Sequence, residues 1–150
     1  MSVMNNRSTK QAYLPHVTPE EMKRMLDCCT NLKHRTLLAL MYSAGLKRRE
    51  VLNLKLTDVL FDRLSIRVRD KIGDVDRHAN LSKLLINDLQ AYCNAYNPFK
   101  WLFEGNIPGD KYNVSSVGKV LTEAKFKAEI KRRITPSMLG QCYKKTSATK

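Results

Sequence analysis

Positively charged side chains gather in two short segments of the chain, and both have the composition of a phosphate-binding site. Their members are Lys47, Arg48 and Arg49 in the first segment, and Arg67, Arg69, Lys71 and Arg77 in the second. A guanidinium group donates paired hydrogen bonds to phosphate oxygens, whereas an ammonium group acts as a mobile point charge. Both segments therefore favour contact with a polyanion.

The overall charge indicates the same class of partner. The 150 residues contain 27 Lys and Arg against 14 Asp and Glu, a formal net charge of +13. Nucleic acid is favoured over a membrane surface because no basic amphipathic anchor helix stands out. A further basic run, Lys131, Arg132 and Arg133, extends the predicted DNA-binding set. The alternative is a basic surface that only keeps the protein in solution.

Metal or cofactor chemistry is not expected. Cys28 and Cys29 are adjacent and lack the two-residue spacing that holds zinc, and the histidines are scattered. We expect no metal, no cofactor and no small-molecule substrate. No apolar run approaches the length that spans a bilayer, and residues 1–10 lack the apolar stretch of a signal peptide. A cytoplasmic, nucleoid-associated protein without membrane contact is predicted.

The elements that position these side chains are expected to be mostly helices. Thr18 should cap a helix that begins at Pro19, with Glu21 as its capping-box partner. A second helix is predicted from about Leu32 to Ala44, where Gly45 ends it. Later helices are predicted around Arg49–Leu52, after Ser82 as far as Asn97–Pro98, after a cap at Ser115 or Ser116, and from Thr135–Pro136.

Between these helices, apolar residues recur at every second position. Leu64, Ile66 and Val68 alternate with polar residues, which predicts a half-buried strand. Gly73–Asp74 supplies a turn, and the segment from Val75 to Leu81 supplies a returning strand. The predicted fold class is α+β, mainly α, with a small antiparallel β-hairpin sheet. A flexible polar arm is expected at residues 1–13, followed by one domain at 14–150.

Three segments, in this order, resemble the catalytic domain of the tyrosine recombinase (phage integrase) family. Gly45-Leu46-Lys47-Arg48-Arg49-Glu50 resembles the family's Gly-Leu-Arg-x-x-Glu motif. Residues 70–82 resemble its β-hairpin, which carries a catalytic lysine and then Asp-Arg and Leu-Ser. Residues 134–141 resemble Thr-Pro-His-x-Leu-Arg-His. The resemblance covers about Leu14 to Tyr143, and it implies the family's fold, duplex DNA as partner, and a role in DNA recombination and integration of a mobile element.

The resemblance also implies which positions would do chemistry. In this family a tyrosine attacks a DNA phosphate, two arginines clamp the transition state, histidines assist, and the hairpin lysine protonates the leaving hydroxyl. The matching positions, apart from the tyrosine, hold Lys47, Lys71, Ser137, Gly140 and Gln141. Lysine keeps the charge of the first arginine but loses its planar fork, and glycine offers only backbone in place of the second. The turn that follows Lys71 also has one extra residue. A degenerate active site is predicted.

The nucleophile is expected to be missing. In the family it lies on a helix well downstream of the third motif, and Tyr143 follows that motif too closely. We therefore expect a domain truncated before the nucleophile helix, and without the DNA-binding domain that precedes it in the family. The predicted function is a catalytically inactive, integrase-like domain that binds duplex DNA with little sequence preference. Two alternatives stay open: residual strand cleavage and rejoining with a tyrosine from another chain, and a non-catalytic partner that modulates an intact recombinase.

Overall fold

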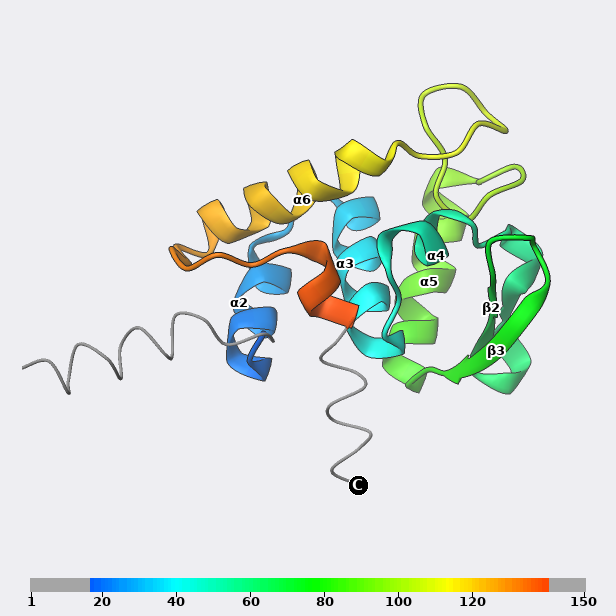
Figure 1. Cartoon of the computed structure of the whole chain (residues 1–150), viewed down its shortest axis with the longest axis horizontal. Helices are drawn as coiled ribbons and strands as arrows, with labels where there is room; N and C mark the ends of the chain where they lie inside the picture. The colour runs from blue at the N-terminus through cyan, green and yellow to red at the C-terminus, as the bar shows by residue number, and fades with distance from the viewer. Residues whose placement is uncertain (1–16, 141–150) are drawn as a thin grey trace, which may run out of the picture.

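Helices make up most of the fold, and three of them pack against a central one, α3 (Figure 1). The helices are α2 (Pro19–Cys28), α3 (Leu32–Ala44), α4 (Arg48–Leu52), α5 (Lys83–Tyr96) and α6 (Val114–Lys127), and residues 136–140 are also helical. The computed structural model describes residues 17–140. The predicted arm at residues 1–13 and the positions Gln141 and Tyr143 lie outside the described residues.

Helix α2 begins as the sequence predicts. The Thr18 side chain accepts a hydrogen bond from the Glu21 amide at 3.1 Å, and the Glu21 carboxylate accepts one from the Thr18 amide at 3.0 Å. Pro19 occupies the first helical position, where its missing N–H costs nothing. The predicted capping box is therefore confirmed, and it orients the buried Met22 and Met25 toward the core.

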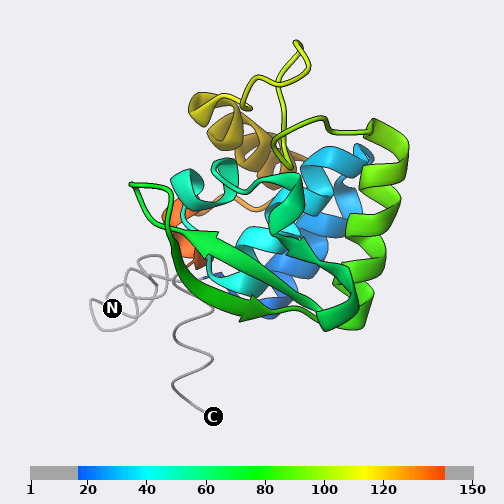
Figure 2. The same cartoon turned by 90° about the vertical axis from the view of Figure 1, so that its right-hand side faces the viewer.

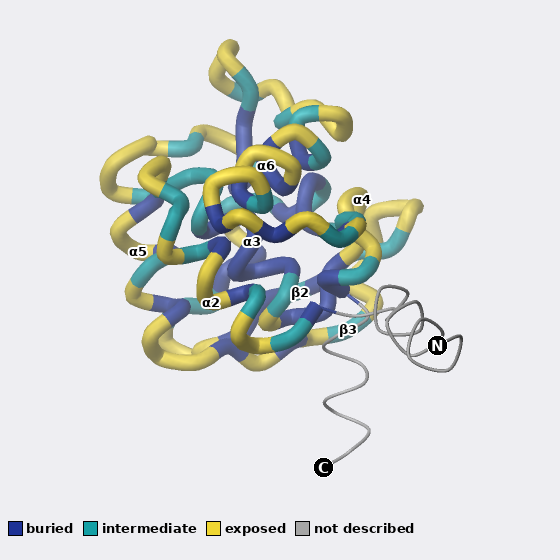
Figure 3. The backbone as a smooth tube through the Cα atoms, turned by 90° about the vertical axis from the view of Figure 1, so that its left-hand side faces the viewer, coloured by how far each residue is buried: buried dark blue, intermediate teal, exposed yellow. Residues whose placement is uncertain are grey.

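Helix α3 is the centre of the hydrophobic core. It is buried along most of its length, visible in the interior of Figure 3. The fully buried Leu37, Leu38 and Leu40 contribute most of that apolar area. Its end at Ala44 is confirmed, because Gly45 adopts the left-handed conformation with φ 67° that closes many helices. The chain turns there and leads directly into α4.

A three-stranded antiparallel sheet covers one side of the helices (Figure 2). Its strands are β1 (Val59–Leu60), β2 (Ser65–Arg69) and β3 (Val75–Asn80), in that order across the sheet. The predicted hairpin is thus confirmed, but β1 was missed, since two residues are too few to show alternation. The prediction for Leu64 was wrong. It has φ 51° and lies in a turn, 38% exposed, before the strand begins.

Two details of the later helices also differ from expectation. By its residue type Leu84 is expected on the buried side of α5, yet it is 73% exposed, and Ile86 of the same helix is buried. Helix α6 is capped by Asn113, whose side-chain oxygen accepts from the Ser115 amide at 2.8 Å. Ser115 and Ser116 lie inside the first turn instead of capping it. Asparagine is as good a helix cap as serine, so the helix starts one residue ahead of the serines.

The cysteines and acidic groups of the described residues form no metal centre. Within residues 17–140, no three His, Cys, Asp or Glu side chains lie close enough to share a metal ion. Burial raises the pKa of Cys93 to about 11, so this thiol is protonated at neutral pH. In the same part of the chain, no helix combines the length and apolarity needed to cross a membrane.

Candidate nucleic-acid interface

A cleft of about 570 Å³ opens where α3, α4, the β2–β3 turn and the helical segment 136–140 meet. Its lining residues are Gly45, Lys47, Arg48, Arg49, Lys71, Thr135, Pro136, Ser137 and Gly140. The structure therefore brings together four of the five positions that the family resemblance assigned, although they are far apart in the sequence. None of these lining residues is acidic, so the cleft carries uncompensated positive charge.

The first wall of the cleft is the start of α4. The Lys47 amide donates to the Glu50 carboxylate at 2.9 Å, which fixes the first turn of the helix. Lys47, Arg48 and Arg49 are exposed, and none forms an ion pair with a carboxylate of residues 17–140. Their charge is available to a ligand.

Glu50 and Arg77 join that wall to the sheet. Arg77 Nη1 lies 3.0 Å from Glu50 Oε2, and Arg77 Nη2 donates to the Gly45 carbonyl at 3.3 Å. Burial alone would raise the pKa of Glu50, but the hydrogen bonds from Arg77 and from the Lys47 amide outweigh it and the pKa is lowered. Glu50 is therefore ionised, as both a helix-start acid and a salt-bridge acid.

Asp58 is a buried acid that the sequence analysis missed, and it holds two of the predicted DNA-binding arginines. Its side chain is fully buried, and Arg69 donates to both of its oxygens, each at 2.9 Å. Arg67 Nε lies 3.3 Å from the same carboxylate, and the Lys55 amide donates to it at 2.9 Å. This hydrogen-bonded pairing raises the pKa of Arg69. Arg67 and Arg69 are consequently turned toward the protein.

The β2–β3 turn places Lys71 at the opposite side of the cleft. One carboxylate oxygen of Asp70 accepts from the amides of Ile72, Gly73 and Asp74, at 2.9, 2.9 and 3.0 Å. Gly73 takes φ 107°, a conformation that other residues rarely adopt. The extra residue in the turn does not remove Lys71 from the cleft, because the turn is closed by Asp70 and Lys71 faces the opening.

The third wall carries Ser137 and Gly140, which the sequence resemblance predicts at the positions of the family's first histidine and second arginine. Ser137 is exposed, and its hydroxyl is hydrogen-bonded to that of Thr135 at 3.2 Å. Gly140 is buried against the α3–α4 connection, and a Cβ atom added there would lie 3.0 Å from the carbonyl oxygen of Leu46. An arginine at position 140 would press on this backbone. Glycine is therefore fitted to its surroundings.

The C-terminal basic run lies outside the cleft. Arg132 donates to both oxygens of Glu21, at 2.7 and 2.8 Å, and ties the segment after α6 to the start of α2. This guanidinium is the main reason that the pKa of Glu21 is lowered from 4.5 to about 2. Lys131 and Arg133 are exposed on either side of it.

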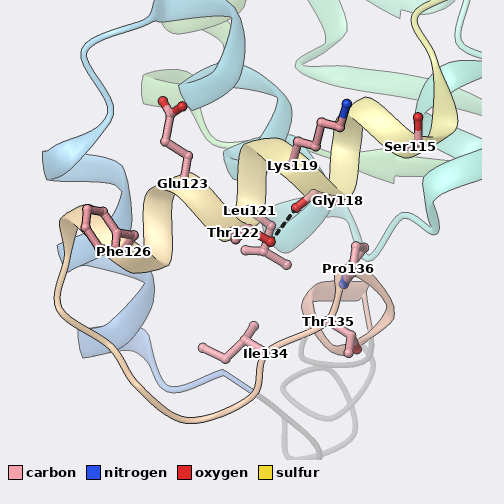
Figure 4. A pocket seen from close by; sticks show the side chains of 10 residues that line it. All are labelled: Ser115, Gly118, Lys119, Leu121, Thr122, Glu123, Phe126, Ile134, Thr135 and Pro136. Carbon is pink, nitrogen blue, oxygen red and sulfur yellow. Dashed lines mark hydrogen bonds between the residues drawn. The ribbon is translucent and has the colours of Figure 1, made fainter.

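An apolar groove of about 610 Å³ runs beside α6 (Figure 4). Leu121 and Ile134 form its walls, and the exposed ring of Phe126 lies at one end, 82% accessible. The groove adjoins the cleft at Thr135 and Pro136, which line both. The sequence analysis did not identify it, because it arises where α6 meets a segment without regular structure.

The geometry of the cleft, its two basic walls and the hairpin define a domain of the phage integrase type. The model of the phage integrase family matches residues 15–141, most of the chain. The chain belongs to that family, so the predicted resemblance and the predicted fold class are confirmed.

Relatives and solved structures agree with this assignment. The chain is 28% identical to tyrosine recombinase XerA of Pyrococcus horikoshii over 130 residues, 85% of this chain and 45% of the relative. A crystal structure of XerA recombinase matches with a TM-score of 0.79 at 21% identity, covering 89% of this chain and 50% of that one. XerH site-specific recombinase bound to its difH substrate matches with a TM-score of 0.76 at 16% identity, covering 91% of this chain and 44% of that one.

At these identities the structures establish the fold. The chain spans about half the length, or less, of the curated relatives it matches.

Proposed function

We propose that this chain binds duplex DNA in the cleft and does not cut it. The observation that carries the proposal is the cleft itself, which presents Lys47, Arg48, Arg49 and Lys71 around one opening without an acidic side chain. Backbone phosphates are the partners that such a surface attracts, because their neutralisation releases counterions. XerH, whose fold this chain shares, was solved with its DNA substrate. Duplex DNA as partner would place the chain in the cytoplasm with the nucleoid, as expected of a domain from a mobile element.

The proposed lack of cleavage rests on what the cleft side chains can donate. Lys47 supplies a charge but no paired donors, and Gly140 supplies no side chain where a second arginine would be needed. Loss of one preorganised donor to a transition state costs about a hundredfold or more in rate. Ser137 offers a single hydroxyl in place of a histidine and cannot replace that donor.

Fewer basic residues are assigned to the proposed binding surface than the sequence alone suggests. Arg67, Arg69, Arg77 and Arg132 form ion pairs within the protein, so we assign them to positioning and Lys47, Arg48, Arg49 and Lys71 to phosphate contact. Lys131 and Arg133 are kept as outlying contacts. Phosphate contacts carry no sequence code, and little sequence preference is therefore expected.

Fluorescence anisotropy with a labelled duplex tests binding. If all four cleft cations contact phosphates, the logarithm of the affinity should fall with the logarithm of salt at a slope of about −3.6, since each contact contributes about −0.9. Two duplexes of unrelated sequence should bind within about threefold of each other. The absence of binding at low salt would remove the proposal.

Incubation with a nicked suicide duplex tests cleavage. The expected result is no covalent protein–DNA adduct, with or without an added second chain that carries a tyrosine nucleophile. An adduct that forms only with the second chain would instead support the alternative in which this chain contributes to strand cleavage and rejoining.

A second candidate function is a non-catalytic subunit that modulates an intact recombinase. The apolar groove beside α6 favours it, because an exposed phenylalanine beside apolar walls is typical of a protein-binding surface. Co-purification with an intact recombinase, and its loss in a Phe126→Ser variant, would support this function. The DNA-binding proposal requires no such partner.

A further inference from the structure

A second basic hollow lies on the other side of the β2–β3 turn from the cleft. Its lining residues are Asn53, Lys55, Arg69, Asp70, Lys71, Ile72, Gly73, Trp101 and Lys111, and its volume is about 230 Å³. We call it the Trp101 hollow. Lys71 lines both this hollow and the cleft, so the two openings are adjacent along one surface.

Three lysines surround the indole ring of Trp101. The ammonium nitrogens of Lys111, Lys100 and Lys55 lie 4.4, 5.1 and 6.0 Å from the centre of the ring. Each is attracted by the aromatic face, and Lys111 also donates to the side-chain oxygen of Asn53 at 2.6 Å. The ring therefore gathers three positive charges that repel one another.

Asp70 is the one acid among the residues that line the hollow, against Lys55, Lys71, Lys111 and Arg69. Within residues 17–140, none of Lys55, Lys71, Lys100 and Lys111 forms an ion pair.

Three carboxylates contact residues that line the hollow, and each is hydrogen-bonded to a guanidinium or to backbone amides. Asp58 binds Arg67 and Arg69, and Asp70 binds the amides of its own turn. Glu104 binds the amides of residues 99–101. The ammonium groups of the hollow therefore remain available to an anion.

The hollow is built on fixed backbone. The Glu104 carboxylate holds the Trp101 amide at 3.1 Å, and Lys55 and Trp101 face each other in a β-bridge. The amides of Leu56 and Leu102 extend this pairing, to the carbonyls of Lys100 and Leu54, at 3.0 and 2.9 Å. The lysines thus project from a preorganised frame, which reduces the entropy lost when they bind a ligand.

We propose that the Trp101 hollow binds a second phosphate of the DNA backbone, on the same duplex that occupies the cleft. Lys55, Lys71 and Lys111, which line the hollow, contact the phosphate oxygens, and Lys100 adds positive charge beside the ring. The apolar faces of Trp101 and Ile72 contact the neighbouring sugar. Ile72 is 86% exposed at the tip of the turn, and an apolar side chain at that position has no partner within the described fold. This inference rests on the proposed function and extends its footprint beyond the turn.

Trp101 is the only tryptophan of the chain, so its fluorescence reports on this hollow alone. Duplex DNA should change the tryptophan emission over the same concentration range in which anisotropy reports binding. If anisotropy reports binding and the emission stays constant, the Trp101 hollow is not a DNA site, although the proposed function stands. If neither signal changes, the proposed function fails with it.

A charge-matched pair of triple variants completes the test. In Lys55→Gln/Lys100→Gln/Lys111→Gln the salt slope should become less negative by about 1 for the phosphate lost, and the affinity should fall about tenfold. The emission change should also disappear.

The control Lys23→Gln/Lys83→Gln/Lys127→Gln removes the same charge from exposed sites outside both openings. Its affinity for the duplex should fall less than threefold, and its emission change should be kept. Equal losses in the two variants would overturn the inference. Equal melting temperatures would show that both triples are folded.

Discussion

The basic residues at the start of α4 and those on the hairpin strands look alike in sequence, yet their surroundings differ. Lys47, Arg48 and Arg49 are exposed and have no carboxylate partner among residues 17–140. Arg69 and Arg77 lie against Asp58 and Glu50. Removing one partner of a buried guanidinium–carboxylate pair is strongly destabilising, because the other charge is left buried and unpaired. The same residue type thus serves the scaffold in one region and is free for a ligand in the other.

The largest effect is expected at the acid that defines the scaffold region. Asp58→Ala leaves Arg67 and Arg69 without their carboxylate in a buried site, so unfolding free energy should fall by about 3–5 kcal/mol. Urea denaturation measures this. The matched control is Asp62→Ala, an exposed acid nearby, which should change stability by less than about 0.5 kcal/mol. Similar losses in both variants would mean that the hairpin arginines do not depend on Asp58.

The next effect concerns the third wall of the cleft. Gly140→Ala brings a Cβ to 3.0 Å from the Leu46 carbonyl, and overpacking of this kind costs about 1–3 kcal/mol. Gly118→Ala is the matched control, because a Cβ there meets nothing within 4 Å and alanine favours the helix. In thermal unfolding, the melting temperature should fall for Gly140→Ala and rise for Gly118→Ala. A stabilised Gly140→Ala would show that an arginine could enter the cleft at this position.

A smaller and pH-dependent effect is expected at the ion pair that fixes the C-terminal basic run. Arg132→Gln should cost about 1–2 kcal/mol at neutral pH, at the low end for charged hydrogen bonds because solvent reaches the pair. The pKa of Glu21 is lowered by folding, from 4.5 to about 2, so its contribution is complete above pH 4.5 and is lost as the pH falls toward 2. Urea midpoints of the two proteins should therefore converge between pH 4.5 and 2. A constant difference over that range would assign the loss to packing.

The smallest effect compares one arginine from each region. Arg48→Gln should weaken duplex binding about three- to tenfold and make the salt slope less negative by about 0.9, with unchanged stability. Arg69→Gln should do the reverse, with lower stability and an unchanged salt slope, because its guanidinium is bound to Asp58. Anisotropy and urea denaturation on both variants decide the matter. If only Arg69→Gln changes the salt slope, the hairpin arginine contacts phosphate and Arg48 does not, which contradicts the proposed roles of the two regions.

Local signals in the sequence predicted the start of α2, the end of α3, the hairpin and the family. Thr18 and Glu21 specify a cap within four residues, and Gly45 has the one conformation that ends α3 there. These features depend on neighbours in the chain, and are therefore readable from it. The same holds for the hairpin turn after Asp70.

Other features were not predicted, because they depend on contacts that form only when the elements pack together. Nothing near Asp58 indicates that Arg69 will bind it, since the two meet only when β2 pairs with β1. Leu84 has the residue type of a core position, but its place on α5 leaves it 73% exposed. For the candidate site, the motifs predicted which residues would meet in the cleft. They did not separate the arginines that are held by acids from the cations that are free.

The contact of Gly140 with Leu46 has a consequence for how the cleft arises. The wall that holds Gly140 packs on the α3–α4 connection, a distant segment of the chain, so the cleft cannot be complete in a fragment that contains only one of them. Closing so long a loop is slow and entropically costly, which places assembly of the cleft late in folding. A nascent chain would thus complete the cleft only after residue 140 had left the ribosome.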